Sequence, residues 1–218
     1  QPNVCELVPE HLRAELMQYE TGRIRFQWEP EPLSRQALCQ RVQASPGPRL
    51  LILNTVQSAA VFASDLCDAY GREAVEHLST ALTAADRAAA SERIKKRLQD
   101  QTDTDWTLVA TSCVEAGVDF SFRTGFREVS SLLSLLQAAG RVNRHGTESE
   151  AEMWSFRLKD DSMLRPNKAL HIEQEVLQRY FMKRMEITPE LSTGFLNDVL
   201  AQDGSCLQKI SSLLQEEE

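Results

Sequence analysis

The sequence lacks the features of a membrane or secreted protein. No apolar run approaches the roughly 20 residues that a membrane-spanning helix needs, and no basic-then-apolar leader opens the chain. The cysteines are odd in number and none has the C-x-x-C spacing of a metal-ligand pair: they are Cys5, Cys39, Cys67, Cys113 and Cys206. These absences predict free thiols, no metal site on this chain, no membrane partner and a reducing, cytoplasmic location. The chain starts at Gln1 rather than Met, so we expect a piece of a longer protein.

Positive charge is also scarce. The chain has 24 Lys and Arg against 32 Asp and Glu, a net charge of -8, which excludes a generally basic nucleic-acid-binding surface. Apolar residues make up 42% and charged residues 26%, the balance of a globular protein. One stretch departs from the acidic trend, because between Phe120 and Gly146 the only acid is Glu128 and the bases are Arg123, Arg127, Arg141 and Arg144. A local basic site therefore remains possible on chemical grounds.

Apolar segments alternate between the periods of strands and helices through the first two-thirds of the chain. Strands are predicted at residues 24–28, 49–54, 74–78, 106–111 and 126–129, with an edge strand at 151–158, and helices at 33–44, 56–70, 83–99 and 131–139. Thr83 is a predicted helix cap and Gly71 a predicted helix stop. This rhythm predicts an α/β fold with a mostly parallel sheet and helices on both faces.

The pattern changes near residue 160. Three helices and no strand are predicted beyond it, at residues 171–183, 189–201 and 205–215. We therefore divide the chain into an N-terminal lead-in (residues 1–22), a sheet domain (23–159) and a C-terminal helical extension (160–218).

Two segments are predicted at the carboxyl ends of the strands, where open parallel sheets bind ligands. The first follows the strand that ends near Thr111 and contains Gly117, and such a turn can hold a phosphate or be a plain loop with a capping Thr. The second places Gln137, Arg141 and Arg144 on one stripe of a helix. Two guanidinium groups on one stripe repel unless an anion meets them, although they could instead complement the end of a helix dipole.

The two segments together resemble motifs V and VI of superfamily 2 helicases. The motif VI pattern Gln-x-x-Gly-Arg-x-x-Arg is matched by Gln137, Gly140, Arg141 and Arg144, and residues 50–56 look like motif IV. Residues 140–146 look most like the CRISPR-associated helicase–nuclease of type I systems, and the resemblance spans residues 50–156. It implies a RecA-like domain that is the second lobe of a two-lobed motor.

The resemblance also implies roles for individual residues. In such a motor ATP lies between the lobes, and this lobe would supply Arg144 and Arg141 to the γ-phosphate. Gln137 would be a polar sensor nearby, and Gly117 and Asp119 would line the nucleotide.

A second set of residues would contact single-stranded DNA. The resemblance places Thr111 and Ser112 on the DNA backbone, with Asn54 and Thr55 as a second backbone contact. Contacts to phosphate and sugar position a strand without reading its sequence.

Several parts of such a motor are missing from the sequence. No Gly is followed by Lys, so there is no phosphate-cradling loop, and no Asp-Glu or His-Asp pair occurs, so the magnesium-binding motif II and the metal nuclease motif are absent. The Mg²⁺ ligands, the N-terminal RecA-like lobe and the nuclease domain would lie elsewhere in the same protein. In the family, an RNA-guided surveillance complex recruits the motor, and this chain alone is expected to be inactive.

Three alternative hypotheses remain at this point. The chain could be the C-terminal lobe of another superfamily 2 helicase in restriction or repair. It could be a non-catalytic nucleic-acid-binding module, although such a module has no use for the two arginines. A small-molecule Rossmann enzyme is disfavoured because no Gly-x-Gly-x-x-Gly follows a strand.

Overall fold

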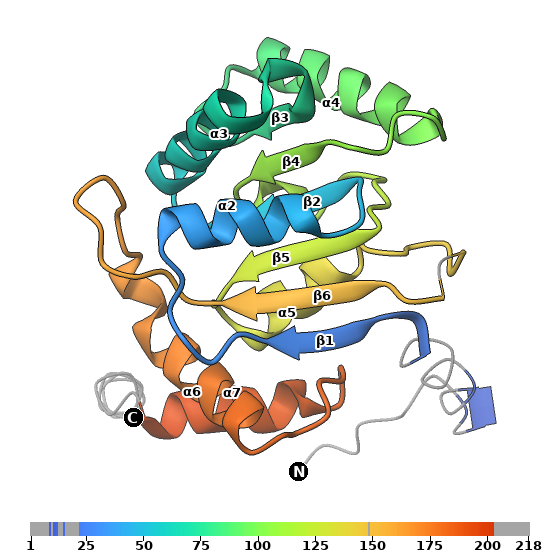
Figure 1. The fold of residues 1–218 in the computed structure, drawn as a ribbon. Coiled ribbons are helices and arrows are strands. Elements are labelled where there is room, and N and C mark those ends of the chain that lie inside the picture. The colour runs from blue at the N-terminus through green and yellow to red at the C-terminus, as the bar shows by residue number, and fades with distance from the viewer. Residues whose placement is uncertain (1–8, 10, 13–14, 16–21, 148, 203–218) are drawn as a thin grey trace, which may run out of the picture.

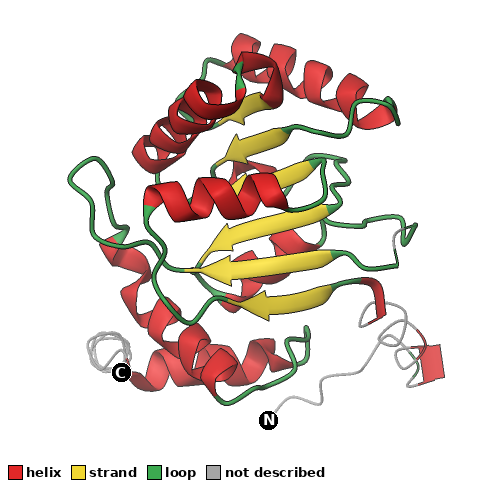
Figure 2. Ribbon diagram, in the orientation of Figure 1, coloured by secondary structure: helices red, strands yellow, loops and turns green. Residues whose placement is uncertain are grey.

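The computed structural model describes residues 9, 11–12, 15, 22–147 and 149–202 (Figure 1). Strands and helices alternate along this part of the chain (Figure 2). The strands are β1 (Arg25–Trp28), β2 (Arg49–Ile52), β3 (Val75–Leu78), β4 (Thr107–Ala110), β5 (Thr124–Glu128) and β6 (Glu152–Phe156). The helices are α2 (Arg35–Ala44), α3 (Val56–Tyr70), α4 (Ala84–Gln99), α5 (Leu132–Ala139), α6 (His171–Met182) and α7 (Leu191–Gln202).

The six strands form one parallel sheet in the order β1-β6-β5-β2-β4-β3. The predicted parallel α/β architecture is therefore confirmed. The prediction that residues 151–158 form an edge strand is wrong, because β6 lies between β1 and β5. Met153 and Phe156 of β6 are buried, and β1, which comes early in the chain, forms the edge instead.

The sheet is covered on both faces. Leu51 and Leu53 belong to one core with α2 and α3, whereas Leu50 and Ile52 belong to a second core with α4 and α5. Consecutive side chains of a strand point to opposite faces, so β2 contributes apolar residues to both cores. Figure 1 shows α2 and α3 in front of the sheet and α5 behind it.

Local contacts mark the helix ends at Thr83 and Gly71, as predicted, and also at Thr55, where no cap was predicted. Thr83 caps α4 by accepting a hydrogen bond from the Asp86 amide, and Thr55 caps α3 in the same way through Ser58. Gly71, with φ 91°, follows the last residue of α3. These contacts satisfy amide and carbonyl groups that helix ends otherwise leave unpaired.

The helices after β6 pack into the sheet domain. Val176 and Leu177 of α6 and Phe195 of α7 belong to the same core as α5, and Phe181 stacks on Trp28 with ring centroids 5.0 Å apart. In Figure 1 this pair of helices lies beyond the β1 edge of the sheet. The predicted helices at residues 171–183 and 189–201 are confirmed within a residue or two, and the third, at 205–215, lies outside the described residues.

Candidate functional site

The loop after β4 presents one of its two predicted hydroxyl groups to solvent. Ser112 is exposed and opens a short 3-10 turn, Ser112–Val114. Thr111 is only 5% exposed, and its Oγ1 donates to Cys113 Sγ over 3.5 Å. Further along, Gly117 has φ 76°, a left-handed conformation that favours glycine. The loop can therefore offer Ser112 to a ligand more readily than Thr111.

The predicted helical stripe of Gln137, Arg141 and Arg144 is wrong in geometry. Helix α5 ends at Ala139, so Gln137 lies exposed on its last turn whereas Arg141 and Arg144 follow the helix. Asn143 has φ 44°, a conformation that Asn tolerates better than most residues, and its amide donates to the Phe122 carbonyl over 2.8 Å. The chain thereby turns away from the helix axis before Arg144.

The arginine segment was predicted at the carboxyl ends of the strands, but it lies at the opposite ends. Val142 pairs with Phe122, which precedes β5, and the Val142 carbonyl accepts from Arg23, which precedes β1. The segment therefore sits by the amino ends of the strands. The physical reason is that α5 starts near the carboxyl ends of the strands and runs back along them. The residues that follow α5 therefore lie near the amino ends.

Arg141 and Arg144 nevertheless come together with the β4–β5 loop. Arg141 donates from Nε to the Val114 carbonyl (3.1 Å) and from Nη2 to the Glu115 carbonyl (2.9 Å). Arg144 Nε lies 2.8 Å from Asp119 Oδ1 in an exposed ion pair. Burial lowers the pKa of Arg141 and the neighbouring charge of Arg144 lowers it further, while Asp119 opposes both. Two guanidinium groups close enough to repel form a site that an anion would relieve.

The predicted second DNA contact is engaged inside the protein. Asn54 donates from Nδ2 to the Val129 carbonyl (2.9 Å) and accepts at Oδ1 from Arg127 Nη1 (2.6 Å). Thr55 Oγ1 accepts from the Ser58 amide and donates to Ser58 Oγ (2.8 Å). The structure thus gives both side chains a structural use at the end of β2 and the start of α3.

Sequence reasoning missed a buried polar cluster that lies between these groups. Arg127 Nε lies 2.8 Å from Glu115 Oε1, and the two side chains are 3% and 7% exposed. Ser134 of α5 accepts from Arg127 Nη2 (2.9 Å) and donates to the Glu115 carboxylate (2.8 Å). Burial lowers the pKa of Arg127, and the carboxylates of Glu115 and Glu128 oppose that shift. The one signal in the sequence was a pair of adjacent charged residues, Arg127 and Glu128, within a predicted strand.

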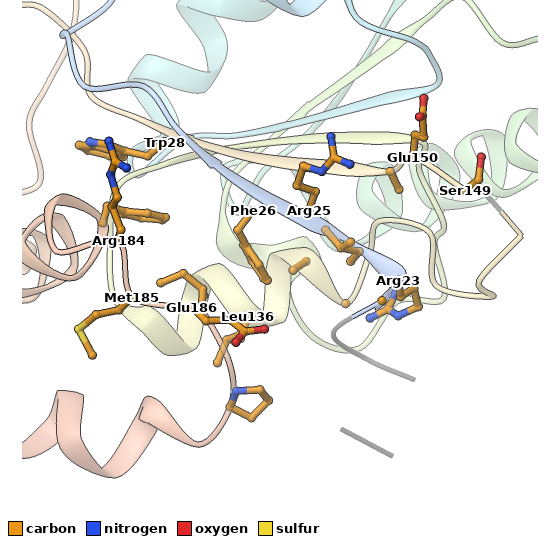
Figure 3. A pocket seen from close by; sticks show the side chains of 18 residues that line it. Arg23, Arg25, Phe26, Trp28, Leu136, Ser149, Glu150, Arg184, Met185 and Glu186 are labelled. Atoms are coloured by element: carbon orange, nitrogen blue, oxygen red, sulfur yellow. The ribbon is translucent and has the colours of Figure 1, made fainter. Parts of the chain in front are cut away.

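One cavity is lined by none of the nine predicted site residues. It has a volume of about 630 Å³ and lies between β1, α5 and the connection from α6 to α7 (Figure 3). Phe26, Leu136 and Met185 are among its lining residues, and Arg23 and Arg25 stand at its β1 side. Because the arginine pair is outside this cavity, the candidate site is an open surface of the domain.

No resident metal centre or membrane span is found in the described part of the chain. No three His, Cys, Asp or Glu side chains gather there in a way that could hold a metal ion. No helix within the same residues combines the length and apolarity that crossing a bilayer demands.

The parallel sheet with helices on both faces is the arrangement of a RecA-like domain. The family model described as "CRISPR-associated nuclease/helicase Cas3, C-terminal" matches residues 46–147, the range that includes the three segments resembling motifs IV, V and VI. These residues, just under half of the chain, are similar to the C-terminal part of Cas3 nuclease/helicases. The predicted family resemblance is thereby confirmed.

Known proteins support this assignment over different lengths. The Cas3 of Haloferax volcanii is 44% identical over 43 residues, which is 20% of this chain and 5% of that protein. The crystal structure of T. fusca Cas3-AMPPNP superposes with a TM-score of 0.65 at 16% identity, covering 88% of this chain and 26% of that one. A chain of a CRISPR RNA-guided surveillance complex, pre-nicking, gives a TM-score of 0.61 at 16% identity, covering 88% and 27%. The chain thus spans about a quarter of the length of these solved relatives, whose likeness shows the fold.

Proposed function

We propose that this chain is the second motor lobe of an ATP-dependent single-stranded DNA translocase of the CRISPR-associated helicase–nuclease kind. The observation that carries the proposal is the pairing of Arg141 and Arg144 beside Asp119 on an open surface. The exposed Arg144 guanidinium is 41% accessible, so a ligand can reach it without a change in the core.

The residues present fit a triphosphate. Arg is suited to bidentate contact with phosphate oxygens, and the mutual repulsion of Arg141 and Arg144 would fall when an anion binds between them. Gly117 gives the neighbouring loop its left-handed turn, and Gln137 stands exposed on the last turn of α5. ATP, when bound, supplies the phosphoryl group whose transfer drives the motor. The chain's own part is to hold Arg144, and through it positive charge, at the phosphate end of the nucleotide.

The DNA-facing surface would lie at the carboxyl ends of the strands. Ser112 is the accessible hydroxyl there, and Thr111 would assist through the shape of the turn rather than through a free side chain. Asn54 and Thr55 would act by holding the end of β2 and the first turn of α3 in place. Such contacts to the DNA backbone are independent of sequence.

Other parts of the same protein would complete the machine. The N-terminal RecA-like lobe would bring the phosphate-cradling loop and the Mg²⁺ ligands, and a separate domain would bring the nuclease centre. An RNA-guided surveillance complex is the proposed recruiting partner, in a cytoplasmic location. Without the first lobe the chain should hold neither nucleotide nor metal firmly.

The isolated chain tests this proposal directly. It should show no ATP hydrolysis and should bind single-stranded DNA weakly, with affinity that falls steeply as salt rises because phosphate contacts release counterions. Ser112→Ala should weaken binding similarly for all base compositions, measured by fluorescence anisotropy between low and high salt. Ser91→Ala on α4 is a matched control remote from this loop. Turnover above background, or a submicromolar complex insensitive to salt, would contradict the proposal.

A further inference from the structure

We propose that Glu115 and Arg127 are positioning residues. They would couple the loop at the carboxyl ends of the strands, where DNA is proposed to bind, to Arg141 and Arg144. This inference rests on the proposed function and adds to it two residues without a predicted role, Glu115 within the motif V segment and Arg127 outside the three motifs. The observation behind it is a series of polar contacts from Asn54 through the buried Arg127 and Glu115 to the half-buried Arg141.

The path begins at the carboxyl end of β2. Arg127 donates from Nη1 to Asn54 Oδ1 (2.6 Å) and to the Glu128 carbonyl (2.9 Å). Its guanidinium therefore holds the residue that precedes the α3 cap Thr55. Since Arg127 is 3% exposed, these hydrogen bonds do not compete with water.

From Arg127 the path continues through Glu115 to Arg141, near the amino ends of the strands. The Glu115 carboxylate pairs with Arg127, and the Glu115 backbone carbonyl accepts from Arg141 Nη2 (2.9 Å). Glu115 of the β4–β5 loop thus contacts both the buried guanidinium of Arg127 and the half-buried Arg141. Any shift of this loop moves both partners.

Ser134 fixes the path to α5. Its hydroxyl accepts from Arg127 Nη2 and donates to Glu115, so the helix that precedes the arginine segment shares both partners. Three elements distant in sequence, the end of β2, the β4–β5 loop and α5, are therefore held by one planar guanidinium group. A lysine could keep the charge but not these separate contacts.

Stability alone is a weak reason for such a pair. Apolar residues of similar volume replace buried ion pairs in other proteins with little loss or even a gain of stability. A polar path with defined donors and acceptors does what an apolar contact does not, because it fixes one relative position of its members. We therefore infer that the Glu115–Arg127 pair fixes the position of the Ser112 turn relative to Arg141.

The test measures how strongly single-stranded DNA stimulates ATP hydrolysis in the gene product that carries both lobes. The ratio of kcat with saturating DNA to kcat without DNA is compared for wild type, Glu115→Leu/Arg127→Met and Arg127→Lys, alongside unfolding midpoints and KM for ATP. We expect the double variant to fold and its stimulation ratio to fall about tenfold, within the range of allosteric coupling. Arg127→Lys should keep the ion pair and still lose most of the stimulation.

The control is the exposed pair Lys95–Glu92 on α4, removed as Glu92→Leu/Lys95→Met, which should leave the ratio unchanged. A folded double variant with a wild-type ratio would overturn the coupling and leave a purely structural role. If the double variant does not fold, Ser134→Ala decides, because an unchanged ratio there overturns the proposal too. Failure of the proposed function itself would look different: wild-type protein would show no DNA-stimulated hydrolysis at all.

Discussion

Two arginine–carboxylate pairs of equal length lie in different surroundings in this molecule. Arg127–Glu115 and Arg144–Asp119 both have a closest N–O separation of 2.8 Å, but the side chains of the first are 3% and 7% exposed and those of the second 41% and 74%. The buried pair has left water and cannot be broken without leaving a charge in the core. The exposed pair is screened by solvent and can exchange its carboxylate for another anion. Although the two distances are equal, the buried pair is a fixed contact, whereas the exposed pair leaves Arg144 available to another anion.

The largest expected difference between the two pairs is in catalysis. In the gene product with both lobes, Arg144→Ala should lower DNA-stimulated ATP hydrolysis by on the order of 10³ or more, the scale of arginine fingers in other nucleotide hydrolases. Arg144→Lys should rescue little, because it keeps the charge and loses the planar fork. Steady-state ATPase assays on folded protein measure this, with Arg93→Ala on α4 as a remote control. Near-wild-type turnover would end the assignment of Arg144 to the phosphate.

The buried pair should give the largest effect on stability. Glu115→Gln removes the carboxylate paired with the buried Arg127, leaving only Glu128 nearby, and should lower the free energy of unfolding by about 3 kcal/mol, the lower end of the range for a broken buried pair. Urea unfolding of the chain, followed by circular dichroism, measures the change. Glu92→Gln breaks the exposed pair with Lys95 and serves as the matched control. A loss below about 1 kcal/mol for Glu115→Gln would mean that water reaches the pair.

The exposed pair should give the smallest effect. Asp119→Asn removes a carboxylate that is 74% accessible and should change the free energy of unfolding by less than about 1 kcal/mol. The same urea titration measures it, at low and at high salt. A cost as large as that of Glu115→Gln would show that exposure does not separate the two pairs.

Much of the fold could be read from local sequence. Thr83 caps one helix and Gly71 follows another, as predicted, because capping and left-handed turns depend on residues within one helical turn. The parallel sheet follows from short apolar strands alternating with helices. The motif VI pattern located Arg141 and Arg144, which the structure brings together with Asp119, whereas the roles assigned to all nine site residues stay predictions.

Tertiary structure decided what local pattern did not contain. The interior place of β6 depends on β1, whose residues pair with it across more than 120 positions of sequence. The sequence could not reveal how the chain turns after Ala139, since the turn at Asn143 is held by the Phe122 carbonyl from another segment. Nor could it pair Arg127 with Glu115 and Asn54, the last of them 73 residues away. The sequence alone thus determined which chemical groups this lobe carries. The packing of distant segments decided which of them became buried contacts and which stayed available, because burial is a property of neighbours in space.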